Sequence, residues 1–93
     1  MSIAILRITL YIPGAHSLKS KRHVVQSLIT RIKNKFNVAI AEVDAQDLYQ
    51  RCELGIVSIN TSNNELQRTM DFVVSFIKSN PESDIVDLNM EIL

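Results

Sequence analysis

The residues in this sequence best suited to chemistry are cations, and they are gathered in its first half. Residues 1–41 contain seven lysines and arginines and no aspartate or glutamate, whereas residues 42–93 contain three cations and all ten acidic residues, so that the net charge is zero. Such an asymmetry predicts an anionic partner for the basic half. It is equally consistent with self-complementarity, in which the two halves of one chain, or two subunits, attract each other.

Most of these cations fall on one predicted helix, residues 18–35. Lysine and arginine neutralise phosphates and position a protein on a nucleic acid without reading its sequence. The free backbone amides at the start of a helix add a second attraction for an anion. The residues predicted to contact phosphate are His16, Lys19, Lys21, Arg22, Arg31, Lys33 and Lys35. The alternative is an ordinary solvated helix face that binds nothing.

The periodicity of this helix divides its cations between two flanks. At 100° per residue, Lys19, Arg22 and Lys33 group on one side of the apolar arc. Arg31 and Lys35 lie on the opposite side. The helix is therefore predicted to be basic on two sides.

A polar stretch, residues 44–51, is the second candidate surface. It joins two predicted strands as a hairpin and is predicted to contact a partner. The residues expected to do so are Asp44, Gln46, Asp47, Tyr49, Gln50 and Arg51.

Lys21 falls inside the apolar arc of the first helix. Its aliphatic stem can lie along the edge of the core while its ammonium reaches past the sheet toward an opposite charge. We predict a structural network in which Asp44 or Asp47 pairs with Lys21, Arg22 or Arg51. Such pairing would brace the hairpin and the loop before the helix into one surface.

Enzyme chemistry finds little support. A metal site or an acid–base site could be formed by His16, Asp44 and Asp47, since the predicted topology brings their loops together. The sequence offers no nucleophile–base pair, no glycine-rich phosphate loop and no dense set of ligands beside them. The single cysteine cannot form an internal disulfide, and no Cys/His cluster has zinc spacing. We therefore expect a protein that is not an enzyme and holds no metal or cofactor.

Six periodic segments must position these residues. Ser17 is predicted to cap the first helix, and Ser62 with Glu65 forms a capping box before the second. Strands are predicted at residues 3–12, 37–44, 52–60 and 85–93, and helices at residues 18–35 and 62–79.

The order of these segments predicts an α+β fold of one domain, residues 1–93. The pattern βαββαβ is typical of the ferredoxin-like sandwich, a four-stranded antiparallel sheet of order 4-1-3-2 with two helices on one face. Right-handed crossovers are strongly preferred, and in this topology the first two strands run parallel. The loop at residues 13–17 and the hairpin at residues 44–50 should then emerge at the same end of the sheet.

The predicted core leaves several apolar side chains outside it. Ile3 and Ile5 make one end of the open sheet face apolar, which supports a homodimer through the sheets. Tyr11 is the single aromatic residue of the two central strands, too few for base stacking across the sheet as in an RNA-recognition motif. Phe72 and Phe76 either pack against the other helix or form a ridge for a partner.

Other positions are assigned to the interior. Cys52 is predicted to be a buried packing thiol, and Gly55 in mid-strand predicts a bulge or a close backbone approach. The last strand is predicted to point Val86, Leu88, Met90 and Ile92 inward.

Several stretches of the chain resemble a known family. They are Ile12-Pro13-Gly14-Ala15-His16-Ser17-Leu18-Lys19-Ser20-Lys21-Arg22, Phe36-Asn37-Val38-Ala39-Ile40-Ala41-Glu42-Val43-Asp44, Gln46-Asp47-Leu48-Tyr49-Gln50-Arg51 and Leu54-Gly55. Together they are similar to the YlxP-like domain of unknown function, a small uncharacterised bacterial family. The resemblance implies a ferredoxin-like fold in a bacterial cytoplasm. It also implies, by gene neighbourhood alone, a link to translation initiation and ribosome maturation. Tyr49 stands where relatives often have Trp, which weakens stacking at that position.

These observations predict a cytoplasmic, non-enzymatic binding module. Its expected partner is ribosomal RNA or a translation factor, held on the basic face of the first helix. The alternative is a homo-oligomeric, protein-binding scaffold with no role in nucleic-acid binding. No apolar run approaches the roughly 20 residues that a membrane-spanning helix needs, and the first residues lack the basic leader of a signal peptide, so no membrane is expected.

Overall fold

The alternating apolar residues of the first strand form the centre of the sheet. The computed structural model describes residues 1–93, and β1 (Ser2–Tyr11) buries Ala4, Leu6, Ile8 and Leu10 on one face. The other elements are α1 (Leu18–Lys35), β2 (Ala39–Asp44), β3 (Arg51–Asn60), α2 (Asn63–Lys78) and β4 (Asp84–Ile92). The six predicted elements are thus confirmed in type and order, although β2 begins at residue 39 rather than at residue 37.

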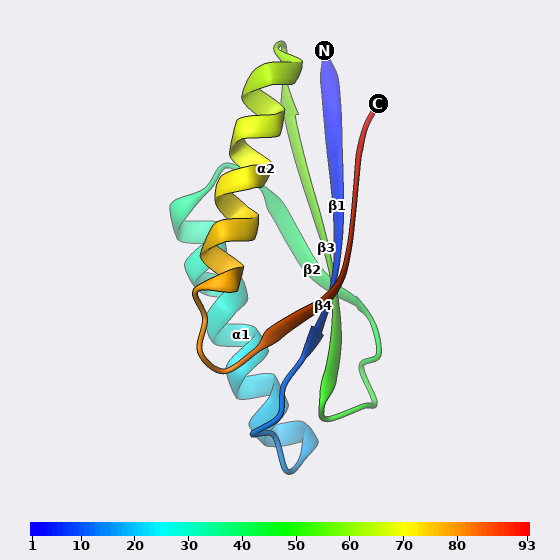
Figure 1. Ribbon diagram of the computed structural model, residues 1–93, viewed down its shortest axis with the longest axis vertical. Helices are drawn as coiled ribbons and strands as arrows, with labels where there is room; N and C mark the ends of the chain where they lie inside the picture. Colours follow the sequence, from blue (N-terminus) through cyan, green and yellow to red (C-terminus); the bar gives the residue numbers. More distant parts are fainter.

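The strands form one antiparallel sheet of order β2-β3-β1-β4. This is the predicted order read from the opposite edge, and both helices cover the same face of the sheet (Figure 1). The β1–α1 loop and the β2–β3 hairpin lie at the same end of the molecule, at the bottom of Figure 1. The backbone amide of Ile12 donates to the carbonyl oxygen of Gln50 at 2.9 Å, which joins the two loops directly.

Both helices begin at the predicted serines. The Ser17 hydroxyl accepts from the backbone amide of Ser20, and the Ser20 hydroxyl accepts from the backbone amide of Ser17, so α1 starts with a complete capping box. The Ser62 hydroxyl accepts from the amide of Glu65 at 3.3 Å, which is one half of the box predicted there. Neither helix carries a stretch both long enough and apolar enough to span a lipid bilayer.

The hydrophobic core contains 18 buried residues between the sheet and the helices. Cys52 of β3 is among them with 0% exposure, as predicted. Burial raises the pKa of its thiol from 9.0 to about 12, and the carboxylate of Glu42 acts in the same direction. The thiol is therefore protonated and shielded at neutral pH.

This shift gives a prediction for alkaline stability. Because the folded-state pKa of Cys52 lies above the unfolded value, its contribution is complete below about pH 9 and is lost as the pH rises toward about 12. Urea unfolding across this range should lose stability faster in the native sequence than in Cys52→Val, where every other titrating group is retained. The same pH dependence in both proteins would contradict the assignment.

The prediction of which β4 side chains point inward is wrong near the start of the strand. Met90 and Ile92 pack against the core, as predicted, whereas Leu88, which pairs with Ile8, is 40% exposed. A register shift between Thr9 and Leu10 of β1 then interrupts the alternation. Because a bulge places two residues opposite one, Ile85 packs against the core, whereas Val86 is 52% exposed.

Gly55 marks a close approach between β3 and β2. A Cβ built on this residue would lie 2.9 Å from Cγ1 of Val43. The accompanying irregularity lies in β2, between Glu42 and Asp44, and not in the strand that carries the glycine. The space above Gly55 is therefore filled by the bulged Val43.

Candidate functional site

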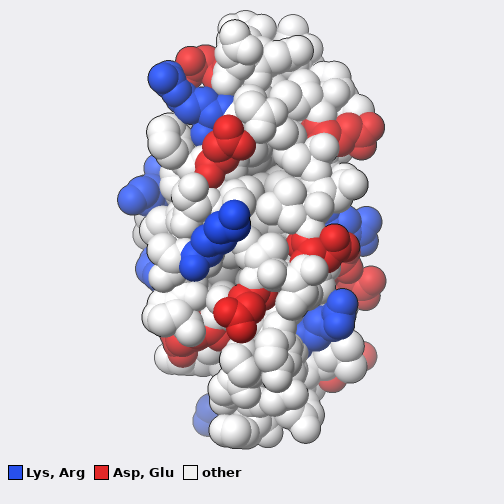
Figure 2. Space-filling model, viewed as in Figure 1, with Lys and Arg blue, Asp and Glu red and all other residues white.

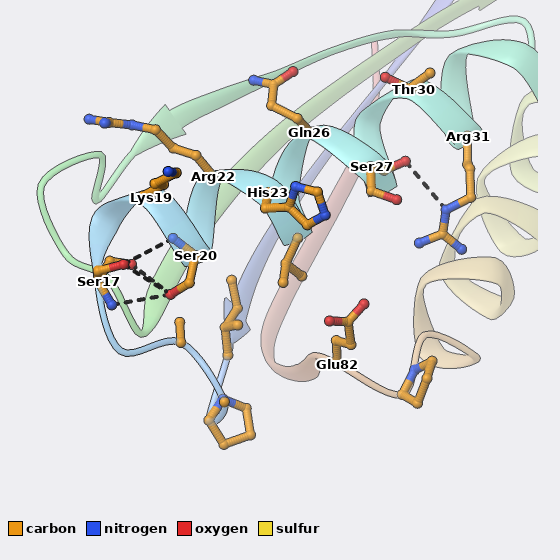
Figure 3. A pocket seen from close by; sticks show the side chains of 16 residues that line it. Ser17, Lys19, Ser20, Arg22, His23, Gln26, Ser27, Thr30, Arg31 and Glu82 are labelled. Atoms are coloured by element: carbon orange, nitrogen blue, oxygen red, sulfur yellow. Dashed lines mark hydrogen bonds between the residues drawn. The ribbon is translucent and has the colours of Figure 1, made fainter.

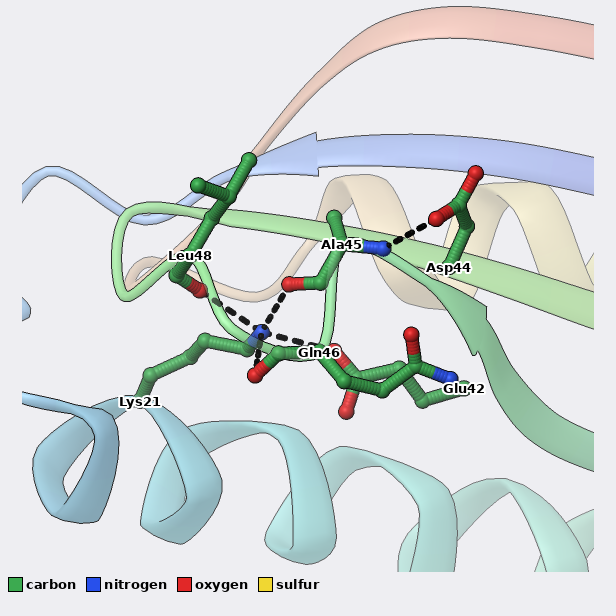
Figure 4. Close-up of polar contacts among 6 residues, drawn as sticks. All are labelled: Lys21, Glu42, Asp44, Ala45, Gln46 and Leu48. Atoms are coloured by element: carbon green, nitrogen blue, oxygen red, sulfur yellow. Dashed lines mark hydrogen bonds and ion pairs between the residues drawn. The ribbon is translucent and has the colours of Figure 1, made fainter.

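Lys21 is the best-defined polar group near the shared loop end. It belongs to the buried side of α1, and its side chain is 0% exposed. Its Nζ donates to the carbonyl oxygens of Ala45 and Leu48, each at 2.7 Å, and lies 2.7 Å from Oε2 of Glu42 (Figure 4). A buried ammonium is stable only when it is paired and hydrogen-bonded. Lys21 therefore ties α1 to the β2–β3 hairpin.

Two predictions for Lys21 are wrong. Its opposite charge is Glu42 of β2. Asp44 instead accepts the backbone amide of Ala45 at 2.7 Å, and Asp47 forms no ion pair. Lys21 also cannot contact a phosphate, because it is fully buried and its donors are already occupied.

The predicted bracing of the two loops is present, with other partners. Nε2 of Gln50 donates to the carbonyl oxygens of Ala15 at 3.3 Å and Pro13 at 3.4 Å. An amide and the buried Lys21, rather than the hairpin aspartates, therefore join the β1–α1 loop, α1 and the hairpin into one rigid end of the molecule.

The exposed cations of α1 on the side away from α2 are Lys19, Arg22 and Lys33, which we call the basic flank. All three are exposed and none takes part in an ion pair. The first turn of α1 contains no acidic residue. A cation there opposes the helix dipole, so the position of Lys19 costs stability in the free protein. An anion bound at this end of α1 would offset that cost.

The other two helical cations lie on the side that faces α2. Nζ of Lys35 is 5.2 Å from the ring centre of Phe76, and the Arg31 guanidinium carbon is 5.7 Å from it. Phe76 packs edge-on against Phe36, which confirms its packing between the helices, while Phe72 is 58% exposed. The cations predicted to contact phosphate are therefore divided between two sides of α1, although Arg31 lines the same groove as Lys19 and Arg22.

A polar groove of about 1170 Å³ runs along α1 between the β1–α1 loop and the α2–β4 loop (Figure 3). Basic and hydroxyl side chains dominate its lining, and Glu82 is its single carboxylate. His16 is exposed beside it, with its backbone amide donating to the Ser20 hydroxyl at 3.0 Å. The labelled polar side chains around the groove are Ser17, Lys19, Ser20, Arg22, His23, Gln26, Ser27, Thr30, Arg31 and Glu82.

A second hollow, of about 530 Å³, lies at the hairpin, and we call it the aromatic cleft. Four of the six predicted partner-binding residues line it: Asp47, Tyr49, Gln50 and Arg51. Sequence reasoning missed Tyr11, which lines the same cleft. Its position on the open face of β1, directly opposite Arg51 in the register, was the signal that could have identified it. The complete lining is Tyr11, Asp47, Leu48, Tyr49, Gln50, Arg51 and Val86.

Two of the predicted hairpin residues point elsewhere. Gln46 is exposed and contributes its carbonyl oxygen to Lys21 at 3.4 Å, and Asp44 is exposed within its own turn. No group of three or more His, Cys, Asp or Glu side chains is close enough to hold a metal ion, so His16, Asp44 and Asp47 are not gathered into such a site.

The charges elsewhere on the molecule are mixed. The face in Figure 2 carries lysine and arginine interspersed with aspartate and glutamate, without a patch of one sign. Two ion pairs lie elsewhere on the molecule, with Arg7 next to Glu53 on the sheet and Arg68 3.4 Å from Glu65 on α2. Lys19, Arg22 and Lys33 are among the cations that no acid pairs, and α1 brings these three to one flank.

Comparisons with known proteins place the chain in a family. Residues 3–90 match the family model described as a protein of unknown function, DUF503. The uncharacterized protein YlxP of Bacillus subtilis (strain 168) is 43% identical over 68 residues, which cover 73% of this chain and 74% of that protein.

Two designed proteins resemble it in structure. The de novo designed protein Foldit4 has a TM-score of 0.55 at 8% identity, with 100% of this chain and 97% of that chain covered. A designed protein with a ferredoxin fold, solved by solution NMR, has a TM-score of 0.49 at 12% identity, covering 99% and 84%. These likenesses concern the fold alone. The chain belongs to the DUF503 family of proteins of unknown function, as the resemblance to YlxP-like proteins predicted.

Proposed function

We propose that this protein is a non-enzymatic module that binds RNA, with ribosomal RNA as its expected target, through the basic flank of α1. The observation that carries the proposal is the set of three exposed cations, Lys19, Arg22 and Lys33, that no carboxylate neutralises. Phosphate contacts of this kind supply affinity without sequence readout.

The surroundings of the flank support a phosphate ligand. Hydroxyls of Ser17, Ser20, Ser27 and Thr30 line the adjoining groove, and hydroxyls and backbone amides are common donors to phosphate oxygens. The capped start of α1 adds the positive end of the helix dipole. A polyanion laid along the groove would meet one carboxylate, that of Glu82.

A homo-oligomeric scaffold is the second candidate. The open sheet face exposes Ile5 and Val57, which are direct cross-strand partners, and also Ile59. Exposed apolar side chains gathered on one face are typical of interaction surfaces. This candidate needs no nucleic acid, and the partner would be a second copy of the chain or another protein.

One salt series distinguishes the two candidates. Fluorescence anisotropy with a labelled single-stranded RNA should give binding that weakens with salt, with a slope of log affinity against log salt of about −2 for three phosphate contacts. Sedimentation velocity of the protein alone in the same buffers reports self-association. Absence of RNA binding at about 0.05 M salt, together with a dimer that persists at high salt, would overturn the RNA proposal in favour of the sheet-face scaffold.

A further inference from the structure

The aromatic cleft has the side chains expected of a nucleobase-binding site. Tyr11 and Tyr49 are 42% and 47% exposed, and both line it. Nucleobases stack on aromatic side chains whatever the base, because every base has a π-face. The volume of about 530 Å³ falls in the range of small-molecule sites. Two exposed aromatic side chains that line a hollow of this size offer a stacking surface to a flat ring.

The lining of the cleft contains one cation, Arg51, and one carboxylate, Asp47, so Arg51 is the group that can attract a nucleotide in preference to an uncharged aromatic ligand. Arg51 lines the cleft and lies directly across the β1–β3 ladder from Tyr11, so the two side chains are neighbours on the open face. Arg51 forms no ion pair. Its guanidinium is free to contact a phosphate or to stack on a base.

The hairpin holds Tyr49 in a braced position. The carbonyl oxygen of Leu48, one residue before it, accepts from Lys21 at 2.7 Å. The side chain of Gln50, one residue after it, donates to the carbonyl oxygens of Pro13 and Ala15. A ring presented between two anchored neighbours loses less freedom on binding than one on a mobile loop. The deeply buried Lys21 thus contributes to a surface that it does not itself reach.

The same contacts connect the cleft to α1. Gln50 lines the cleft, whereas Pro13 and Ala15, whose carbonyl oxygens it contacts, line the groove that adjoins the basic flank. One strand of nucleic acid can therefore pass from the groove over the β1–α1 loop into the cleft.

We propose that the cleft between Tyr11 and Tyr49 stacks one base of a single-stranded RNA whose phosphates lie along α1. This inference rests on the function proposed above and specifies it further, because it selects unpaired RNA over a duplex, whose bases are stacked and not available to the rings.

The composition of the protein provides a direct probe. The chain has two tyrosines and no tryptophan, and both tyrosines line this cleft. Protein labelled with 3-fluorotyrosine should give two ¹⁹F signals, both reporting from the proposed site. Adenosine, which has a base but no phosphate, should shift both signals, and a short single-stranded RNA should do so at lower concentration.

The variants test the rings separately from the charge. Tyr49→Ala should weaken binding of the RNA oligonucleotide about 5- to 150-fold, while Tyr49→Phe, which keeps the ring, should bind nearly as the native protein does. Phe72→Ala removes an aromatic residue of α2 that is more exposed than Tyr49 and lies outside the cleft, and it should have no effect. An oligonucleotide with abasic sites should lose affinity to the same extent as Tyr49→Ala.

The outcomes separate the two proposals. RNA that binds with both fluorotyrosine signals unmoved, and with equal affinity for the abasic strand, would overturn the cleft and leave the basic flank standing. A second outcome is that adenosine shifts the fluorotyrosine signals while charge reversal at Lys19, Arg22 and Lys33 leaves the RNA affinity unchanged. This result would support the cleft and overturn the role of the flank. Failure of adenosine and RNA alike to bind would overturn both.

Discussion

Replacing Lys21 with Met is expected to lower the free energy of unfolding by about 3–5 kcal/mol, the usual cost of removing one partner of a buried ion pair. The substitution leaves the Glu42 carboxylate, 17% exposed, without its cation. It also removes the donor that the carbonyl oxygens of Ala45 and Leu48 share. Urea unfolding followed by circular dichroism measures the loss.

Two further variants identify the cause. Lys19→Met removes a lysine from the same helix that is exposed and forms no ion pair, and it should change stability by less than about 0.5 kcal/mol. The double variant Lys21→Met with Glu42→Leu should recover part of the loss, because it removes both buried charges. A loss below about 1 kcal/mol in Lys21→Met would show that water replaces the ammonium and that the contact does not hold the hairpin.

Reversing the basic flank with Lys19→Glu, Arg22→Glu and Lys33→Glu is expected to abolish RNA binding. Three contacts to a single strand contribute about 100-fold in affinity at ~0.1 M salt, and the new carboxylates add repulsion. The melting curve should stay nearly unchanged, since all three side chains are exposed and unpaired. Glutamate near the start of α1 even suits the helix dipole better than lysine does.

The control variant reverses cations on the other helix, α2. Arg68→Glu with Lys78→Glu alters α2, where Arg68 is already paired with Glu65, and RNA affinity should fall only slightly. Anisotropy titrations of both proteins against one labelled RNA measure the difference. Equal weakening by the two variants would point to net charge alone and contradict a localised interface.

Local periodicity was sufficient for most of the fold. The alternation in β1, the serine caps of both helices and the order of the elements were all readable from sequence, because each depends on a few neighbouring residues. The meeting of the β1–α1 loop with the hairpin followed from the topology alone. The basic flank was also readable, since helical spacing fixes which side chains share a side.

Contacts that depend on the exact path of the backbone were not readable. The register shift beside Leu10 reversed the expected direction of the Val86 side chain, and no residue type in the sequence predicts such a bulge. The partner of Lys21 was predicted among the hairpin aspartates, yet Glu42 in the strand before them lies closer. The aromatic cleft was not predicted because its two tyrosines are 38 positions apart in sequence and come to line one hollow only in the folded sheet.

The position of β1 in the sheet has a consequence for biosynthesis. β1 pairs with β3 and with β4, which lies furthest from it along the described sequence, so its contacts are among the most distant in sequence. Such pairings are slow to form, and an unpaired strand edge is a template for aggregation. Until residues 84–92 leave the ribosome, one edge of β1 has no neighbour. A nascent chain that stops before Asp84 therefore exposes an unpaired edge of β1, the kind of edge that promotes aggregation.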